Sequence, residues 1–295
     1  MYPEKIIEIL KHLSVFQRDG KRAPHKPLLL LFALGRMLNR NQRLISFSEI
    51  ESEFKNILAS FSPWNRAYRP EFPFWRLKSD GLWSVENEQN FTLNSSGDPL
   101  KSDLVKMNPS AGFKTEIYET IKNDRVLLKT TVETILTTYF PSTIHEDILQ
   151  AVGLDANIGN SSVRQERDIN FRDKILKAYE YKCSICGFDV RLGNQPIALE
   201  AAHIKWVQAG GPCIEENGVA LCAMHHKLFD RGAFSISTEM KIMVSDEANG
   251  SLGFNEWLMS FHRKDIRRPQ RATSYPKEEF ISWHIREVFR GEYRN

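Results

Sequence analysis

The chain has 295 residues, of which 41% are hydrophobic and 26% are charged, and its formal net charge is +3. The length suggests two domains, and the composition is that of an ordinary globular protein. No apolar run approaches the roughly 20 residues that span a bilayer, and the N-terminal residues mix charges into a helical pattern unlike that of a signal peptide. We therefore expect a cytoplasmic protein that does not associate with a membrane.

Basic residues are spread unevenly along the chain. Residues 18–43 contain seven Lys or Arg against one acid, and residues 262–271 contain five against one acid. Either run could follow the phosphates of a nucleic acid or form a solvated face. Because the net charge is small, composition alone does not decide between these two interpretations.

The first part of the chain is predicted to be rich in helices. Pro27 suits the first turn of a buried helix over residues 26–38. Ser46 or Ser48 is a suitable N-cap for the helix that follows. Further helices are predicted at residues 46–58, 112–124, 127–140 and 140–154, the last capped by Ser142 or Thr143.

Strands and a linker complete the predicted organisation. Aromatic and β-branched residues between 72 and 85 are typical of strands, and Asp80-Gly81 indicates a hairpin turn between them. A polar stretch with Gly, Asn and Ser follows residue 155. We therefore expect a first domain over residues 1–155, a linker over 156–168 and a second domain over 169–295.

The second domain has a shorter series of predicted elements. A helix over residues 171–182 leads into Cys-x-x-Cys, and short strands come before a helix at 225–232. Residues 233–245 are predicted to form a hairpin, and residues 275–289 an amphipathic helix. On that last helix, Trp283 and His284 either pack in the core or contact a nucleic acid.

Four residues in the second domain have the spacing of a metal site. Cys183 and Cys186 form one pair, and Cys222 and His225 form a second, Cys-x-x-His pair. Two such pairs separated by a loop are typical of tetrahedral zinc, and four protein ligands leave no open position for chemistry. The alternative is a buried thiol cluster. Cys213 is predicted to have no ligand role, the alternative being a thiol next to the zinc.

His226 remains outside this set of ligands. On a helix, His226 is rotated by about 100° from its neighbour, and Asp230 lies four residues later on the same face. A histidine and a carboxylate on one face form half of a site for a divalent ion. The alternative is an exposed histidine and an aspartate that ends the helix.

The order of the candidate residues carries a resemblance. His203 ends a strand-like run, Asn217 lies in a glycine-rich loop, and His226 lies on a helix, framed by the two zinc-type pairs. This order resembles that of the HNH nucleases of the ββα-metal class. The resemblance implies DNA phosphodiester hydrolysis, with His203 as general base and Asn217 fixing the loop that holds the base.

The same resemblance implies a catalytic Mg²⁺ or Mn²⁺ held by His226 and Asp230, beside the structural Zn²⁺. Many HNH enzymes have a further metal ligand directly before the base, but this chain has Ala202 there. Glu200 lies two residues before Ala202 on the same strand face, and could contribute a ligand.

The N-terminal domain combines basic groups with proline and aromatic residues in "RAPHKPLLLL", "RAYRPEFPFWRLKSDGLW" and "NPSAGF". These stretches resemble the sulfur-binding domain of restriction endonucleases that attack phosphorothioate-modified DNA. In that family an apolar pocket accepts the sulfur that replaces a phosphate oxygen. Carried onto this chain, the resemblance implies a pocket at Phe72 and Pro73, supported by Phe74 or Trp75. It also implies DNA contacts from His25, Lys26, Arg76 and a loop containing Ser110, Ala111 and Gly112.

Taken together, these patterns predict the α+β fold class, with a mixed helical and β N-terminal DNA-reading domain and a C-terminal zinc-containing ββα-metal HNH nuclease domain. The expected partner is double-stranded, phosphorothioate-modified DNA, and cleavage of both strands suggests a homodimer. One alternative is an HNH nuclease that reads a methylated base, although no aromatic cage is apparent in the sequence. Another is a zinc-stabilised DNA-binding module without catalysis.

Overall fold

The computed structural model describes residues 2–15, 17–18, 21–22, 24–61, 68–155 and 169–294. These residues divide into two compact units, one within residues 2–155 and one over 169–294. The predicted linker, 156–168, lies outside the described residues. Helices and strands occur in both units, so the expected mixed α and β class is confirmed.

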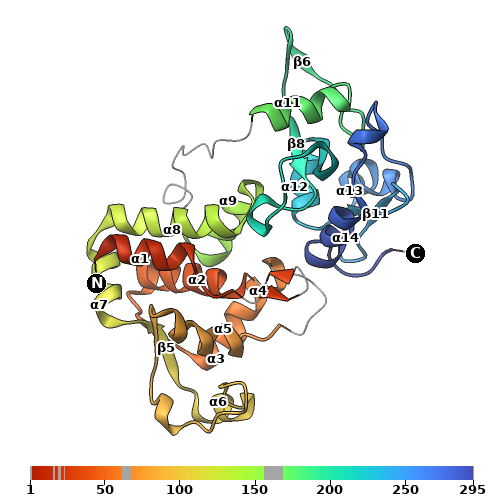
Figure 1. Ribbon diagram of the computed structural model, residues 1–295. Coiled ribbons are helices and arrows are strands. Elements are labelled where there is room, and N and C mark those ends of the chain that lie inside the picture. The colour runs from red at the N-terminus through yellow and green to blue at the C-terminus, as the bar shows by residue number, and fades with distance from the viewer. Residues whose placement is uncertain are drawn as a thin grey trace. The chain divides into compact units, whose positions relative to one another are not determined.

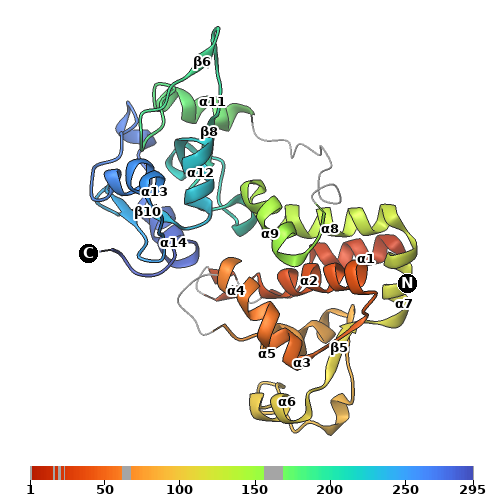
Figure 2. The ribbon, with the colours of Figure 1, turned by 180° about the vertical axis from the view of Figure 1, so that it is seen from behind.

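The first unit is built around α2 (His25–Arg40), whose residues 28–34 are almost completely buried. Helices α1 (Pro3–Lys11), α8 (Arg125–Tyr139) and α9 (His145–Val152) lie close to it (Figures 1 and 2). At Gly35, an added Cβ would lie 2.0 Å from the Val152 carbonyl oxygen. The glycine therefore allows α9 to approach the backbone of α2.

The first unit also contains a three-stranded antiparallel sheet. Its order is β3 (Leu44–Ser46), β5 (Ser110–Phe113) and β4 (Trp83–Val85). Gly112 is in the central strand, where an added Cβ would lie 1.8 Å from the Arg43 carbonyl oxygen. The other elements of this unit are β1 (Gln17–Arg18), β2 (Lys21–Arg22), α3 (Phe47–Glu49), a π-helix (Ile50–Phe54), α4 (Lys55–Phe61), α5 (Glu71–Arg76), α6 (Lys101–Met107) and α7 (Thr115–Asn123), with short 3-10 helices at Leu77–Asp80, Glu88–Asn90 and Ser142–Ile144.

Several predicted local features hold. The helix over 26–38 is α2, and Ser46 caps the next helix, where it forms a capping box with Glu49. The two predicted helices at 112–124 and 127–140 are α7 and α8, and Asp124 caps α8 by accepting hydrogen bonds from two backbone N–H groups.

Other local predictions are wrong. The aromatic segment predicted as a strand begins as helix α5, because Pro70 precedes its first turn and Glu71 lies in that turn. Gly81 does turn the chain, at φ 86°, but it joins a 3-10 helix to β4 and not two strands. The N-cap of α9 is Ile144, not Ser142 or Thr143. The predicted loop at residues 110–112 is the central strand β5.

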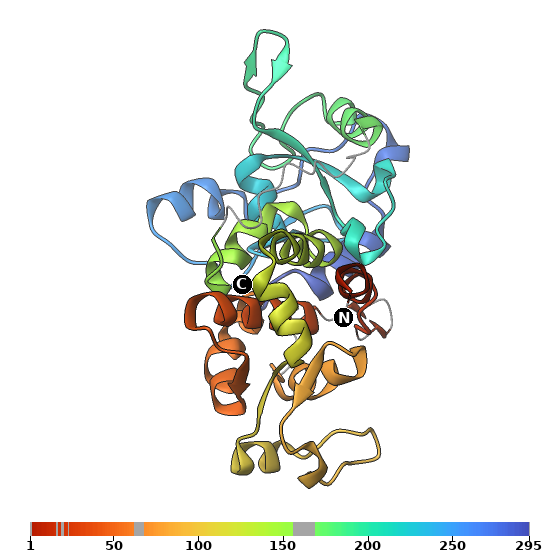
Figure 3. The ribbon, with the colours of Figure 1, turned by 90° about the vertical axis from the view of Figure 1, so that its left-hand side faces the viewer.

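The second unit contains a ββα arrangement. Strands β8 (Leu199–His203) and β9 (Gly218–Cys222) pair antiparallel, and α12 (Ala223–Asp230) follows β9 directly. Helix α11 (Ile169–Ala178) packs on both strands. A small hairpin, β6 (Arg191–Leu192) and β7 (Gln195–Pro196), leads into β8 and projects from the unit (Figure 3).

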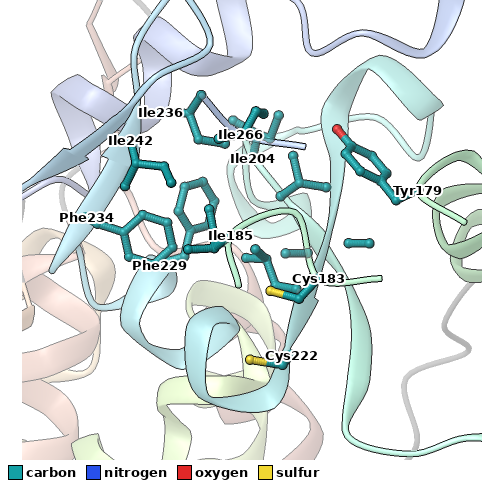
Figure 4. Close-up of a cluster of buried hydrophobic side chains, with 14 of the residues drawn as sticks. Tyr179, Cys183, Ile185, Ile204, Cys222, Phe229, Phe234, Ile236, Ile242 and Ile266 are labelled. Atoms are coloured by element: carbon teal, nitrogen blue, oxygen red, sulfur yellow. The ribbon is translucent and has the colours of Figure 1, made fainter. Parts of the chain in front are cut away.

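The predicted hairpin at 233–245 is β10 (Phe234–Ile236) and β11 (Ile242–Val244), and the C-terminal amphipathic helix is α14 (Glu278–Glu287). Helix α13 (Leu252–Trp257) and short 3-10 helices at Val207–Ala209, Glu215–Asn217, Met259–Phe261 and Ala272–Ser274 complete the unit. Figure 4 shows its core, in which the side chains of Tyr179, Ile204, Phe229 and Phe234 gather near those of Cys183 and Cys222. Among the described residues, none of the helices has the length and apolar character needed to cross a membrane.

Candidate active site and metal centre

The four residues of the predicted zinc site come together. Ligand atoms of Cys183, Cys186, Cys222 and His225 all lie within 4.8 Å of one another. His225 Nδ1 lies 3.2 Å from Cys222 Sγ, and its Nε2 lies 2.9 Å from the Trp257 carbonyl oxygen. Because the carbonyl can only accept, Nε2 carries a proton, and Nδ1 is the ring nitrogen that faces the sulfurs and could bind a metal ion. This donor set could hold a metal ion.

The electrostatics of the cluster favour a cation. Hydrogen bonds from Cys186 and Cys222 hold the pKa of the Cys183 thiol far below its usual range. Hydrogen bonds with Cys183 and Cys186 raise the pKa of Cys222. Burial lowers the pKa of His225, but hydrogen bonds to the same two cysteines outweigh burial and raise it to about 10. The cluster therefore stabilises negative charge on sulfur, and a bound dication would allow further thiols to ionise.

His226 has different partners from its neighbour. Its Nδ1 lies 2.6 Å from a Glu200 carboxylate oxygen, and its Nε2 lies 3.2 Å from an Asp230 carboxylate oxygen. Burial lowers the pKa of His226, but the charges and hydrogen bonds of Asp230 and then Glu200 raise it to about 9. Two carboxylates from β8 and α12 therefore flank this imidazole.

The two carboxylates differ in access to solvent. The side chain of Asp230 is 2% exposed, whereas that of Glu200 is 38% exposed. Asp230 also accepts a hydrogen bond of 3.0 Å from the indole N–H of Trp206. Asp230 is therefore enclosed by donors, and Glu200 lies on the accessible side of His226.

His203 lies at the end of β8, where it pairs in register with Gly218. Its ring stacks on that of Phe171, with 3.9 Å between centroids and 11° between planes. An added Cβ at Gly218 would lie 2.9 Å from the Phe171 ring. The glycine thus lets α11 approach close enough for Phe171 to fix the plane of the imidazole.

Asn217 is fully buried and closes the loop that follows β8. Its side-chain oxygen accepts from the Lys205 N–H at 2.8 Å, and its amide nitrogen donates to the carbonyl oxygens of Lys205 and Pro212 at 3.0 and 2.9 Å. Gly211 fits inside this closure, because an added Cβ would lie 1.9 Å from the Lys205 carbonyl oxygen. The loop next to His203 therefore has a fixed path.

Sequence reasoning missed two contacts of this site. Cys213 was predicted to have no ligand role, and its sulfur lies 3.5 Å from His203 Nε2. Trp206 was not singled out, although it fixes Asp230. The only sequence signal for Trp206 is its position three residues after His203, and the position of Cys213 depends on the loop closed by Asn217.

Of the two roles considered for Trp283 and His284, core packing and nucleic-acid contact, the structure supports core packing. Trp283 is 4% exposed and His284 is completely buried. His284 stacks on Phe229 with 3.7 Å between centroids and bonds to Ser235 and to the Phe229 carbonyl. Burial lowers its pKa to about 3, so it is neutral.

In the first unit, the predicted pocket residues are split between surface and core. Phe72 is half-buried, and the Arg76 guanidinium lies 4.4 Å from its ring centre. Pro73 is buried. Phe74 and Trp75 belong to the core, where Trp75 donates its N–H to the Gly97 carbonyl at 2.9 Å. Phe72 is therefore the aromatic ring of this set that reaches the surface.

The predicted DNA contacts of the first unit have partners within it. Lys26 is buried at the start of α2, after His25, and its ammonium lies 2.5 Å from an Asp80 carboxylate oxygen. Arg76 pairs through two nitrogens with Asp98. The segment 110–112 lies in β5, with Ala111 fully buried and Ser110 half-buried.

Two segments of the chain match known protein families. Residues 3–157, more than half of the chain, match the family described as "ScoMcrA-like, DNA sulfur-binding domain". The chain belongs to this DNA sulfur-binding family. Residues 183–237 match the HNH endonuclease family, so the chain also carries an HNH endonuclease domain. Both resemblances inferred from the sequence, and the expected enzyme class, are confirmed.

Several solved structures are similar to parts of the chain. The sulfur-binding domain of ScoMcrA complexed with phosphorothioated DNA is 23% identical, with a TM-score of 0.46, over 52% of this chain and 98% of that one. The corresponding domain of SprMcrA is 20% identical, with a TM-score of 0.44, over 52% and 95%. The type IV restriction endonuclease ScoMcrA is 26% identical, with a TM-score of 0.37, and the match covers 28% of its length. No match is found among curated proteins.

Proposed function

We propose that this protein is a modification-dependent restriction endonuclease, which binds phosphorothioate-modified double-stranded DNA with its first unit and hydrolyses nearby phosphodiester bonds with its second. The observation that carries the proposal is the joining, in one chain, of a DNA sulfur-binding domain and an HNH domain. The proposed domain boundaries are residues 1–155 and 169–295. The protein would act in the cytoplasm, where it meets DNA.

Sulfur recognition follows from the chemistry of the modified phosphate. Sulfur is larger and more polarizable than oxygen and accepts hydrogen bonds poorly, so an apolar contact costs it less desolvation than it costs an oxygen. In the proposal, Phe72 and Pro73 supply this apolar contact. The guanidinium of Arg76, which lies close to the Phe72 ring and pairs with Asp98, would interact with the backbone charge beside the sulfur.

Several of the other residues predicted to bind DNA have narrower roles in the proposal. Phe74 and Trp75 are buried and would support the pocket from the core. His25 and Ser110, both half-buried, are candidates for direct contact. Lys26 is buried against Asp80, so its contribution would be to fix the start of α2.

Hydrolysis requires a base for the attacking water, and His203 is our candidate. A neutral imidazole takes a proton near physiological pH, and the parallel Phe171 ring fixes its plane. Asn217 holds the adjacent loop through its three side-chain hydrogen bonds. The base is thus held on a rigid strand and loop.

A divalent ion would be held on the accessible side of His226, by its Nδ1 and by Glu200. The carboxylate of Asp230 is enclosed by Trp206 and His226, so Asp230 would orient the imidazole instead of binding the ion directly. This differs from the ligand set expected by resemblance, His226 and Asp230. When bound, Mg²⁺ or Mn²⁺ stabilises charge on the scissile phosphate and the leaving oxygen.

Zinc would occupy the Cys183, Cys186, Cys222 and His225 cluster in a structural role. The register Leu199–Cys222 places this cluster at one end of the β8–β9 hairpin and His203 at the other, about 13 Å along the strands. A zinc ion held there would anchor the hairpin that carries the base, without taking part in the hydrolysis. Cutting both strands would require two copies of the chain, as in a homodimer.

The test is cleavage of matched plasmids with Mn²⁺. One plasmid carries phosphorothioate linkages, one carries methylated bases and one is unmodified. We expect cutting of the sulfur-modified plasmid alone, and loss of cutting in His203→Ala. Preferential cutting of the methylated plasmid would overturn the recognition part, and full activity of His203→Ala would overturn the catalytic part.

A further inference from the structure

The thiol of Cys213 faces one ring nitrogen of His203. Sγ lies 3.5 Å from Nε2, a distance suited to a hydrogen bond with the larger sulfur atom. Cys213 is exposed, and it does not belong to the cluster formed by Cys183, Cys186, Cys222 and His225. Its contact is therefore with the proposed base and not with the proposed zinc.

The loop around Cys213 is built to keep the thiol there. Pro212, the preceding residue, has its carbonyl held by the Asn217 side chain at 2.9 Å. Gly211 donates its backbone N–H to the Trp206 carbonyl at 2.9 Å and has no room for a side chain. The Ile204 N–H in turn donates to the Asn217 carbonyl at 3.0 Å. Both ends of the loop, one next to His203 and one next to Cys213, are thus tied to Asn217.

We propose that Cys213 is a positioning residue for His203, an inference that rests on the proposed function. A neutral imidazole carries one proton, and the position of that proton decides which nitrogen acts as the base. If sulfur accepts a hydrogen bond from Nε2–H, the lone pair of the ring is on Nδ1. In the arrangement we infer, the sulfur accepts and does not donate, so that Nδ1 is the nitrogen that removes the proton from water.

The same contact assists the reaction as charge develops. A proton passes from water to His203 Nδ1 while the water oxygen bonds to phosphorus, and the electron pair of the broken P–O bond leaves with the alkoxide. His203 is then an imidazolium with N–H donors on both nitrogens. The polarizable sulfur of Cys213 accepts from Nε2–H in both states, so the ring need not reorient during the step. Phe171 fixes the plane of the ring, and Cys213 fixes the position of the proton within that plane.

The test compares Cys213→Ala with Cys213→Ser in the full-length protein. The serine hydroxyl can accept from Nε2–H, whereas alanine cannot. At saturating Mn²⁺ and DNA, we expect alanine to lower the single-turnover rate constant by about 10- to 100-fold, the range found for groups that orient metal-bound histidines. We expect serine to restore most of that loss, and the DNA dissociation constant to stay within about twofold in both variants.

A second measurement does not depend on activity. Long-range ¹⁵N–¹H NMR of the histidine-labelled protein reports which ring nitrogen of His203 carries the proton. We expect the Nε2–H form in the wild type and in Cys213→Ser, and a mixture of tautomers in Cys213→Ala. Zinc content and melting temperature, measured on the same samples, separate a positioning role from a structural one.

Two results would overturn the inference. One is wild-type cleavage and an unchanged His203 tautomer in Cys213→Ala. The other is an equal loss of activity in both variants, together with loss of zinc or early melting, because that pattern belongs to a structural thiol. Failure of the proposed function is distinct from either, because in that case His203→Ala itself cleaves like the wild type.

Discussion

Replacing Asp230 by Asn tests how the second unit would hold its catalytic ion. Asp230 is 2% exposed and accepts from Trp206 at 3.0 Å, and its other oxygen lies 3.2 Å from His226 Nε2. Without an ion, both ring nitrogens donate, Nε2 to Asp230 and Nδ1 to Glu200. When an ion binds at Nδ1, the Asp230 carboxylate would keep the remaining proton on Nε2. An amide that still accepts from Trp206 presents its NH₂ group to Nε2, which moves the imidazole proton to Nδ1.

The size of the effect can be bounded from the structure. Despite burial, Asp230 and Glu200 raise the pKa of His226 from 6.5 to about 9, which corresponds to about 3 kcal/mol in favour of positive charge at this place. The negative charges of the same two carboxylates also stabilise a bound dication. Because Asp230 acts through His226, Asp230→Asn should weaken Mn²⁺ binding by about 10- to 100-fold, whereas Glu200→Gln removes a ligand and should weaken it more.

The assay is a titration of Mn²⁺ followed by electron paramagnetic resonance, with zinc already bound and His226→Ala as the null reference. The predicted order of affinity is wild type, then Asp230→Asn, then Glu200→Gln. Wild-type affinity in Glu200→Gln, together with an Asp230→Asn variant as weak as His226→Ala, would refute the reasoning and make Asp230 the direct ligand.

Three other predictions concern folding, zinc and sulfur. His284 has a pKa near 3 when folded and 6.5 when unfolded, so its contribution to stability is complete above pH 6.5 and decreases by up to about 5 kcal/mol as pH falls toward 3. In urea unfolding, the free energy of unfolding should therefore fall less with decreasing pH in His284→Gln than in the wild type. An equal fall of the unfolding free energy in both proteins would contradict this. Cys186→Ser should lose the bound zinc and have a lower melting temperature, whereas Cys213→Ser should keep the metal. Metal analysis and calorimetry measure both effects, and a full zinc content in Cys186→Ser would disprove the ligand set. Phe72→Ala should weaken binding of phosphorothioated DNA by about tenfold and leave binding of unmodified DNA unchanged. A substitution at the exposed Val126, Val126→Ala, serves as the control. An equal loss of affinity for both DNAs in a binding titration would argue against a sulfur contact.

The zinc-type cluster was predictable because its ligands are local in sequence. Cys183 and Cys186 share one turn, and Cys222 and His225 share another, so that spacing alone brings each pair together. The separation of His226 from His225 was predictable for the same reason, since adjacent residues on a helix face different ways. The Ser46 cap depends on only three or four neighbouring residues and was therefore also predictable from the sequence.

Contacts that depend on the path of the chain were not predictable. Phe72 and Arg76 meet as an i,i+4 pair, which exists because the segment is helical, whereas its aromatic composition favours a strand. Cys213 reaches His203 only after Asn217 closes the loop between them. Likewise, no local pattern indicates that Trp206 rather than a metal ion would occupy one oxygen of Asp230.

The central claim is that the first unit distinguishes a sulfur atom from an oxygen atom in the DNA backbone. Its most direct test is a fluorescence anisotropy titration of the full-length His203→Ala protein with two duplexes that differ in one non-bridging atom. Our account predicts that the phosphorothioate duplex binds at least about tenfold more tightly, a difference of about 1.4 kcal/mol, at one fixed salt concentration. Equal dissociation constants for the two duplexes would contradict it.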